Sequence, residues 1–461
     1  MQTRRMSWRV PNRGTSAGAV AAVALALGAI AGCTSVADAS TMPVAAAPVV
    51  SAPIVSRGVT IPAFYTPPAA LPQANGALVR TEALPLAVSL PGITGTLPGR
   101  ATRLMYKSTD SNGAPVAVTG AYIEPTAAWT GNGPRPLVVV APGTMGQGDQ
   151  CSASFGLEHP VVVTPNTISV GYEILAMYRL LANGIGVVVT DYVGLGTTDR
   201  LHTYVNRVDE GHAVLDAARA VRALPGTSLT PGSLIGLYGY SQGGGATAAA
   251  AELQPSYAPD VPLAGAYVGA PPADLAALTR AIDGSALAGA LGWAVNGFVQ
   301  ADPALRPILN GYLNAAGQAA LTDLSTMCVG DAILTYGYQH STAWTTTGQS
   351  ISDIVATVPV AQAVFAKQRI GTLKPTGPVR VATGVNDNLV PHAQARTLAV
   401  DWCGLGGNVT YVPVNAPALG DALLNHFGPL LADQAPAIDW LTNRLTGQPG
   451  VSNCSTMPTQ P

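Results

Sequence analysis

The sequence predicts an α/β protein whose mostly parallel sheet is covered by helices on both faces. Short, continuously apolar runs alternate with longer segments of helical spacing, which is the pattern of parallel strands buried on both sides. The 461 residues, 48% of them hydrophobic, are enough to bury a large core. Only 10% are charged, which excludes a disordered chain and a nucleic-acid-binding protein with a basic face.

The expected elements follow one another along the chain. A hairpin comes first, with strands at 103–108 and 116–123 around Asp110-Ser111-Asn112-Gly113. Helical spacing of the apolar residues predicts helices over 170–181 and 210–224. Buried strands are expected at 137–141, 186–190, 234–240, 264–268, 379–383 and 409–414.

The alternation stops between residues 271 and 372, where helix-like segments rich in Ala, Gly and Leu replace it. One of them, 284–301, carries no charge. As a membrane span this segment is barely long enough and is broken by glycines. We therefore expect a helical cap over 271–372, inserted between two parts of an α/β core at 62–270 and 373–461.

The N-terminus has the features of an export signal. Arginines without any acid precede an uncharged run over 14–32, which closes in Ile30-Ala31-Gly32-Cys33. This ending resembles the lipobox of bacterial lipoproteins, so residues 1–33 are expected to be a signal peptide with Cys33 as the lipidated residue. A plain secretory signal and a retained anchor are the alternatives. Residues 34–61, rich in Ala, Pro, Val and Ser, are expected to form an extended linker.

Four further cysteines indicate disulfides. An exported chain meets an oxidising compartment, so two bridges are expected, and four cysteines allow three pairings. The spacing does not match a zinc site, and neither a metal nor another cofactor is expected. The four are Cys151, Cys328, Cys403 and Cys454.

The strand predicted at 234–240 runs into Gly239-Tyr240-Ser241-Gln242-Gly243, and an alanine-rich, helix-favouring segment follows. This is the strand–turn–helix setting of the G-x-S-x-G nucleophile elbow. Small flanking residues permit the sharp turn, and the helix N-terminus favours negative charge at the attacked carbonyl. A second match, Gly14-Thr15-Ser16-Ala17-Gly18, follows no strand and is interpreted as accidental. Ser241 is thus the candidate nucleophile, and a buried glycine-rich turn is the alternative.

A serine nucleophile needs a base held by a third group, and behind such an elbow the acid and then the His follow in the chain. Asp387 stands where a predicted strand runs into a turn, and His426 follows the last predicted strand. Weaker candidates are Asp401, Asp421, His340 and His392.

An oxyanion hole requires two backbone N–H donors. One is expected from Gln242, directly after the nucleophile. The other is expected from the glycine-rich stretch 141–148, with Thr144 and Met145 as candidates.

Together these motifs resemble the secretory lipase family, the Candida lipase A-like enzymes of fungi and actinobacteria. The resemblance spans roughly residues 64–454, and it implies an α/β-hydrolase fold, ester hydrolysis by Ser241, Asp387 and His426, and the disulfides Cys151–Cys328 and Cys403–Cys454. The carboxylate-assisted oxyanion hole of the yeast lipase is not expected, because Thr144-Met145 stand in that place. The segments that carry the resemblance are Phe64-Tyr65-Thr66-Pro67-Pro68, Ala141-Pro142-Gly143-Thr144, Gly148-Asp149-Gln150-Cys151, Thr190-Asp191-Tyr192-Val193-Gly194-Leu195-Gly196, Gly239-Tyr240-Ser241-Gln242-Gly243 and Gly384-Val385-Asn386-Asp387.

The function expected from the sequence is an exported serine carboxylester hydrolase acting on acylglycerols or other lipid esters. A serine peptidase, an acyltransferase and a non-catalytic surface lipoprotein are the alternatives. The membrane is an expected partner through Cys33, and nucleic acid is not. The uncharged segment 284–301 is expected to line the acyl-binding path, with simple cap core as the alternative. Its candidate residues are Leu287, Leu291, Gly292, Trp293 and Phe298.

Overall fold

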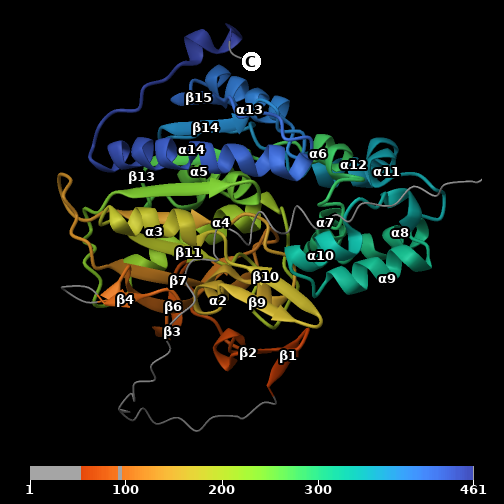
Figure 1. Cartoon of the computed structure of the whole chain (residues 1–461), viewed down its shortest axis with the longest axis horizontal. Helices are drawn as coiled ribbons and strands as arrows, with labels where there is room; N and C mark the ends of the chain where they lie inside the picture. The colour runs from red at the N-terminus through yellow and green to blue at the C-terminus, as the bar shows by residue number, and fades with distance from the viewer. Residues whose placement is uncertain (1–52, 92–95, 460–461) are drawn as a thin grey trace, which may run out of the picture. The chain divides into compact units, whose positions relative to one another are not determined.

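Nine strands form one mixed sheet, as the sequence predicts for this fold class (Figure 1). The computed structural model describes residues 53–91 and 96–459. The strand order is β15-β14-β13-β12-β8-β11-β7-β6-β3. From β15 to β11 the pairing is parallel, and β7, β6 and β3 extend the sheet in antiparallel fashion. The bounds are β3 (Leu78–Leu84), β6 (Gly99–Thr109), β7 (Pro115–Pro125), β8 (Leu137–Ala141), β11 (Gly186–Thr190), β12 (Ile235–Tyr240), β13 (Leu263–Gly269), β14 (Val379–Gly384) and β15 (Val409–Val414). Every predicted strand is present.

The central strands are apolar throughout because both faces of the sheet are buried. In β8, Leu137, Val139 and Ala141 belong to one hydrophobic cluster, whereas Val138 and Val140 belong to the cluster on the opposite face. This alternation follows from the two-residue period of a strand. The first cluster lies under α4 (Arg207–Arg222), α5 (Gln242–Tyr257) and α13 (His392–Gly404), and the second under α2 (Ala153–Glu158), α3 (Ile174–Ala182) and α14 (Ala422–Leu445).

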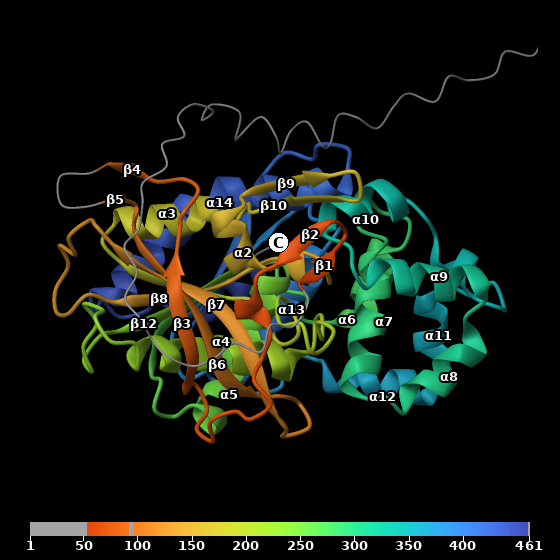
Figure 2. The same cartoon turned by 90° about the horizontal axis from the view of Figure 1, so that it is seen from below.

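A group of helices lies to one side of the sheet, where the sequence predicts the inserted cap (Figure 2). These helices and the chain that joins them share a third hydrophobic cluster, with Trp293, Leu324 and Trp344 among its buried members. The cap helices are α6 (Leu275–Ile282), α7 (Ala290–Ala301), α8 (Leu305–Tyr312), α9 (Ala315–Leu324), α10 (Val329–Tyr336), α11 (Ile351–Thr357) and α12 (Pro359–Lys367). Within the part of the chain that the structure describes, no helix has the length and apolarity needed to cross a bilayer.

The helix predicted over 170–181 starts too early. Val170 is the last residue of β10 (Thr167–Val170), which pairs antiparallel with β9 (Val161–Thr164), and α3 begins only at Ile174. The turn at Pro165-Asn166, between two β-branched runs, is the hairpin signal that helical spacing obscured. Likewise the uncharged segment 284–301 becomes helical only at Ala290, where α7 begins.

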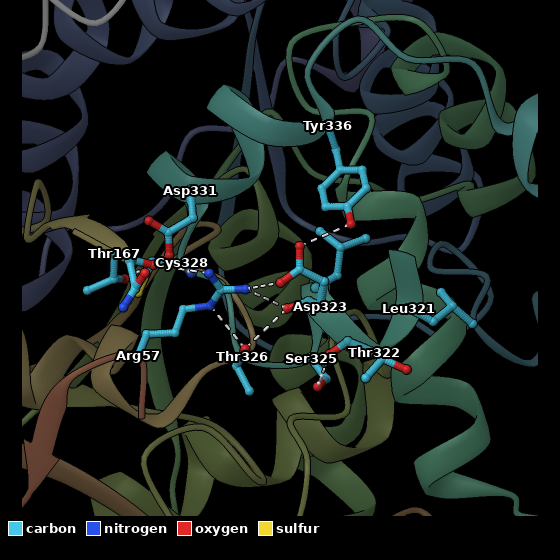
Figure 3. A network of polar contacts seen from close by, with 12 residues as sticks. Arg57, Thr167, Leu321, Thr322, Asp323, Ser325, Thr326, Cys328, Asp331 and Tyr336 are labelled. Carbon is cyan, nitrogen blue, oxygen red and sulfur yellow. Dashed lines mark hydrogen bonds and ion pairs between the residues drawn. The ribbon is translucent and has the colours of Figure 1, made fainter. Parts of the chain in front are cut away.

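The predicted linker is also too long, because its last residues form a hairpin of β1 (Ile54–Ser56) and β2 (Val59–Ile61). Figure 3 shows contacts between the turn of this hairpin and the cap. The Arg57 guanidinium at its turn forms an ion pair with Asp323 at the end of α9 and donates to Thr326 Oγ1 at 3.0 Å. It also donates to the Asn166 carbonyl at 3.0 Å. A strand pair from the start of the described chain is thereby fastened to the cap.

Two disulfides are formed, and their pairing is the one that the family resemblance implies. Cys151–Cys328 joins the loop after β8 to the start of α10, and Cys403–Cys454 joins α13 to the C-terminal 3₁₀ turn. The second bridge closes a chain segment that contains His426.

Candidate active site

Ser241 occupies a sharp turn between β12 and α5. Its φ of 59° and ψ of −126° lie outside the regions that L-residues favour, and its N–H is held by the Gly269 carbonyl at 2.9 Å. The glycines on either side are required by close contact. A Cβ on Gly239 would approach the Gly243 carbonyl oxygen to 2.1 Å, and one on Gly243 would approach the Ala141 oxygen to 2.0 Å. Such strain, held in place by close packing, is typical of a nucleophile elbow.

Asp387 and His426 are brought together from two separate segments. Asp387 follows β14, and His426 lies in the first turns of α14. His426 Nδ1–H donates to Asp387 Oδ2 at 2.7 Å, while Asp387 Oδ1 accepts the N–H groups of Leu389 and Val390 at 3.1 and 3.0 Å. Both side chains are almost fully buried. The carboxylate therefore fixes the imidazole in the tautomer that leaves Nε2 free to accept a proton.

His426 lies beside the elbow. Tyr240, the residue before Ser241, donates its hydroxyl to the His426 carbonyl at 2.7 Å, and the two rings are 5.1 Å apart. His426 Nε2 is buried without a hydrogen-bond partner among the described residues. Leu389 and Val390, which hold Asp387, line the same cavity as Ser241. The three candidate residues thus come from three segments, each of which lies beyond the carboxyl end of a parallel strand: β12, β14 and β15.

The other candidate acids and bases have different surroundings. His392 Nε2 lies 3.0 Å from the Tyr411 hydroxyl, and its Nδ1 donates to the Gly384 carbonyl. His340 is exposed in the cap near Asp283. Asp401 pairs with Arg369, and Asp421 caps α14. Within the described residues, no side chain of these four is hydrogen-bonded to the elbow or to a residue that lines the cavity at Ser241, whereas the His426 carbonyl accepts from Tyr240 and Asp387 accepts from Leu389 and Val390.

Of the candidate oxyanion-hole residues, Thr144 and Gln242 line the cavity with Ser241. Met145 does not, because its side chain packs against the Cys151–Cys328 disulfide. Glu173 anchors the loop that carries Thr144, because its Oε1 accepts the Gly143 N–H at 2.7 Å. Burial raises the pKa of Glu173 to about 7. Gln242 is the first residue of α5, where backbone N–H groups have no intrahelical partner.

Two adjoining apolar cavities extend from Ser241 into the cap. The first, about 40 Å³, lies at the serine, and the second, about 130 Å³, lies between cap helices. They share lining residues, and none of the described residues that line either one is charged. The shared residues are Thr279, Leu291, Ala294, Phe298 and Phe365.

The candidate acyl-binding residues, four of them in α7 and Leu287 in the turn before it, divide into two groups. Leu287, Leu291 and Phe298 line the first cavity. Gly292 and Trp293 line neither, so their assignment is wrong. A Cβ on Gly292 would meet Leu324 of α9 at 2.4 Å, and the Trp293 indole donates to the Leu324 carbonyl at 2.9 Å. These two residues hold α7 against α9.

Sequence reasoning missed several residues around the elbow, among them His202, Tyr204 and Glu210. Tyr204 lines the cavity with Ser241, and the other two contact the side chain of Gln242. The motif 190–196, which carries part of the family resemblance, leads into the loop that contains His202 and Tyr204. It was the signal that could have drawn attention to these residues. The described residues contain no group of three or more His, Cys, Asp or Glu side chains placed to hold a metal ion.

Comparisons with known proteins agree with this architecture. A family model for secretory lipases matches residues 158–453. A "probable inactive lipase" of Mycobacterium tuberculosis is 29% identical over 84% of this chain and 82% of that protein. Lipase 10 of Candida albicans is 26% identical over 86% of this chain and 84% of its own length. The structure of Candida antarctica lipase A superposes with a TM-score of 0.70 at 20% identity, covering 85% of this chain and 87% of that one. The fold is that of an α/β-hydrolase.

Proposed function

The chain belongs to the secretory lipase family, and on that premise we propose that it is an exported serine ester hydrolase that forms an acyl-enzyme on Ser241. The observation that carries the proposal is the paired Asp387–His426 unit beside a strained serine. His426 Nδ1 is engaged by the carboxylate, and its buried Nε2 has no partner in the described part of the chain. That nitrogen is the base that a serine hydroxyl requires.

In the proposed reaction, Ser241 Oγ attacks the ester carbonyl carbon while His426 Nε2 takes the hydroxyl proton. The N–H groups of Gln242 and Thr144 stabilise the negative oxygen of the tetrahedral intermediate. The intermediate collapses, the C–O bond to the alcohol breaks, and the alcohol leaves with the proton from His426. Water then repeats the sequence on the acyl-enzyme and releases the acid.

The cavities favour a fatty acyl group over a peptide. Their lining is apolar, so a bound acyl chain would lose water without leaving a polar group unpaired. A peptide carries an amide group at every residue, and such groups are costly to bury unpartnered. We therefore assign acylglycerols or similar lipid esters as the substrate class, with the acyl chain along Leu287, Leu291 and Phe298.

The function test is hydrolysis of p-nitrophenyl esters of graded chain length, with and without a serine-directed organophosphate. Wild-type protein is expected to hydrolyse them and to lose activity with the organophosphate. Each buried methylene contributes ~0.8 kcal/mol, so kcat/KM should rise by up to about fourfold per methylene until the cavities are filled. Ala294→Phe, on the residue that both cavities share, should depress the long-chain rates while acetate and butyrate change little.

Ala319→Phe is the matched control, because Ala319 is exposed on cap helix α9 and lines neither cavity. It should leave the chain-length profile unchanged. Equal losses on all esters in Ala294→Phe would contradict the acyl path. Absence of hydrolysis and of organophosphate labelling in the wild type would instead favour a non-catalytic protein, which the name of the Mycobacterium tuberculosis relative also suggests.

The proposal includes export with a lipid anchor. The two disulfides agree with an oxidising compartment. Cys33, the proposed acylation site, lies outside the described residues. Labelled palmitate is expected to enter the wild-type protein in bacterial cells and to be missing from Cys33→Ala. A mature protein that carries no label and does not begin at Cys33 would show simple secretion instead.

A further inference from the structure

The loop between β11 and α4, residues 191–206, contacts both halves of the proposed oxyanion hole. One half is the elbow at Gln242 and the other is the β8 loop at Thr144, and these two segments are about a hundred residues apart in the chain. None of the loop contacts is part of the Ser241–Asp387–His426 unit. What the loop does for the reaction is therefore a separate question.

The elbow half is held through the side-chain amide of Gln242. Its Nε2 donates to Glu210 Oε1 at 2.7 Å and lies 3.1 Å from His202 Nε2. His202 Nδ1 lies 2.9 Å from the Val193 carbonyl, which can only accept, so Nδ1 carries the proton. His202 Nε2 is then an acceptor, and both hydrogens of the Gln242 amide are used. The side chain of Gln242, whose backbone N–H is the first proposed oxyanion donor, is therefore fixed in one orientation.

The β8 half is held by hydroxyl groups from the same loop. Tyr204 OH lies 2.8 Å from Thr144 Oγ1, and Tyr192 OH donates to the Pro142 carbonyl at 2.7 Å. The Tyr192 ring stacks on His202, and the Tyr204 ring meets His202 edge-on, each at 5.9 Å between centroids. One packed unit of three rings therefore contacts both segments.

The loop is also strained where it makes these contacts. Tyr192 has a φ of 68° and Val205 a φ of 56°, which is rare for a β-branched residue. Glu210 Oε1 accepts the Val205 N–H at 3.0 Å as well as the Gln242 amide, so it ties the strained residue to the elbow. Tyr204 and Val205 both line the cavity at Ser241. Strain that surrounding bonds maintain is concentrated at functional sites.

We propose that His202, Tyr204 and Glu210 are positioning residues of the oxyanion hole, which hold the backbone of Thr144 and Gln242 at a fixed separation around the substrate oxygen. This inference rests on the proposed function. Backbone donors stabilise an oxyanion only where they are already in place before the reaction, so a brace between the two donor segments should act mainly on the transition state.

The charge state of the brace agrees with this role. Burial lowers the pKa of His202 to about 4 and raises the pKa of Glu210 to about 8. At neutral pH the histidine is uncharged and the carboxyl is mostly protonated. A carboxylate this close to the hole would oppose the developing negative charge, whereas a neutral acid does not.

Tyr204→Phe is the sharpest test, because it removes only the hydroxyl at Thr144 and keeps the ring contacts. With p-nitrophenyl butyrate we expect kcat to fall on the order of 10- to 100-fold, less than for loss of a direct donor, with KM nearly unchanged. Inhibition by butylboronic acid, whose serine adduct places an oxygen in the hole, should weaken by the same factor. Tyr122→Phe is the control: its buried ring carries a hydroxyl that donates to Glu124 and lies beside Gly186, at the opposite end of β11 from the loop, so the melting temperature should fall while kcat stays.

A second pair of variants addresses Glu210. Glu210→Gln keeps an oxygen that accepts from Gln242 and Val205, so it should retain most of the kcat that Glu210→Leu loses. The inference is overturned if Tyr204→Phe has wild-type kcat and boronate affinity, or if Tyr122→Phe loses kcat equally. A wild-type protein without esterase activity or organophosphate labelling would overturn the proposed function itself, which is a different result.

Discussion

Ser241→Ala is expected to lower kcat for p-nitrophenyl butyrate by several orders of magnitude, on the order of 10⁵ to 10⁶. Without the hydroxyl no acyl-enzyme forms, and His426 Nε2 has no proton to accept. The backbone should not change, because alanine tolerates the φ of 59° about as well as serine and the Ser241 N–H bond to Gly269 is retained. Turnover by stopped assay, labelling by a fluorescent phosphonate and the melting temperature are the three measurements.

Ser16→Ala in the second G-x-S-x-G sequence is the matched control and should leave turnover and labelling unchanged. Near-normal turnover in Ser241→Ala would contradict the assignment of the nucleophile. If the wild type and Ser241→Ala are equally inactive and unlabelled, the chain is a non-catalytic member of its family.

Local sequence pattern predicted eight of the nine strands of the sheet and missed only β3 at its edge. Strands such as 137–141 and 186–190 are short β-branched runs bounded by turn residues, and they form β8 and β11 with the predicted bounds. The pattern failed where a residue fits both the 3.6-residue period of a helix and the two-residue period of a strand. Val170 fits both a helix face and a strand, and only its pairing with Val161 shows which holds. The order of strands in the sheet depends on tertiary contacts that no local pattern contains.

The acyl-binding candidates show a signal that was present but incompletely used. Leu291, Ala294 and Phe298 recur at intervals of three and four residues, which is one face of α7, and all three line the first cavity together with Leu287 from the turn before the helix. Gly292 lies off that face and packs toward Leu324. The absence of charge alone could not separate the two sides of α7, whereas its periodicity could.

The bracing residues had no periodic signal, and the motif 190–196 marks only the start of their loop. His202 and Glu210 are polar, fully buried and defined by contact with Gln242, which lies at least 32 residues away along the chain. A buried histidine or carboxyl is unusual, but a sequence pattern does not show which residues such a side chain contacts. By contrast, Ser241, Asp387 and His426 each follow a strand end, which is why pattern and chain order could single them out as candidates.

Asp387→Asn is expected to lower kcat by about 10⁴-fold with KM little changed. The reason lies in the fixed bonds of this side chain. Oδ1 accepts two N–H groups, from Leu389 and Val390, so an asparagine keeps its carbonyl oxygen there and presents its NH₂ to His426. The NH₂ donates to Nδ1, which moves the imidazole proton to Nε2. A protonated Nε2 cannot accept the Ser241 proton.

Asp421→Asn is the control for this variant, since it makes the same chemical change five residues before His426. Asp421 caps α14 by accepting the N–H groups of Leu423 and Leu424, and asparagine caps a helix equally well. Its kcat and melting temperature should therefore stay close to wild type. Both variants can also be followed by the ¹⁵N shifts of His426, because only Asp387→Asn should move the proton from Nδ1 to Nε2. Loss of activity in Asp421→Asn, or an Asp387→Asn enzyme within tenfold of wild type, would mean that the imidazole is oriented by another group.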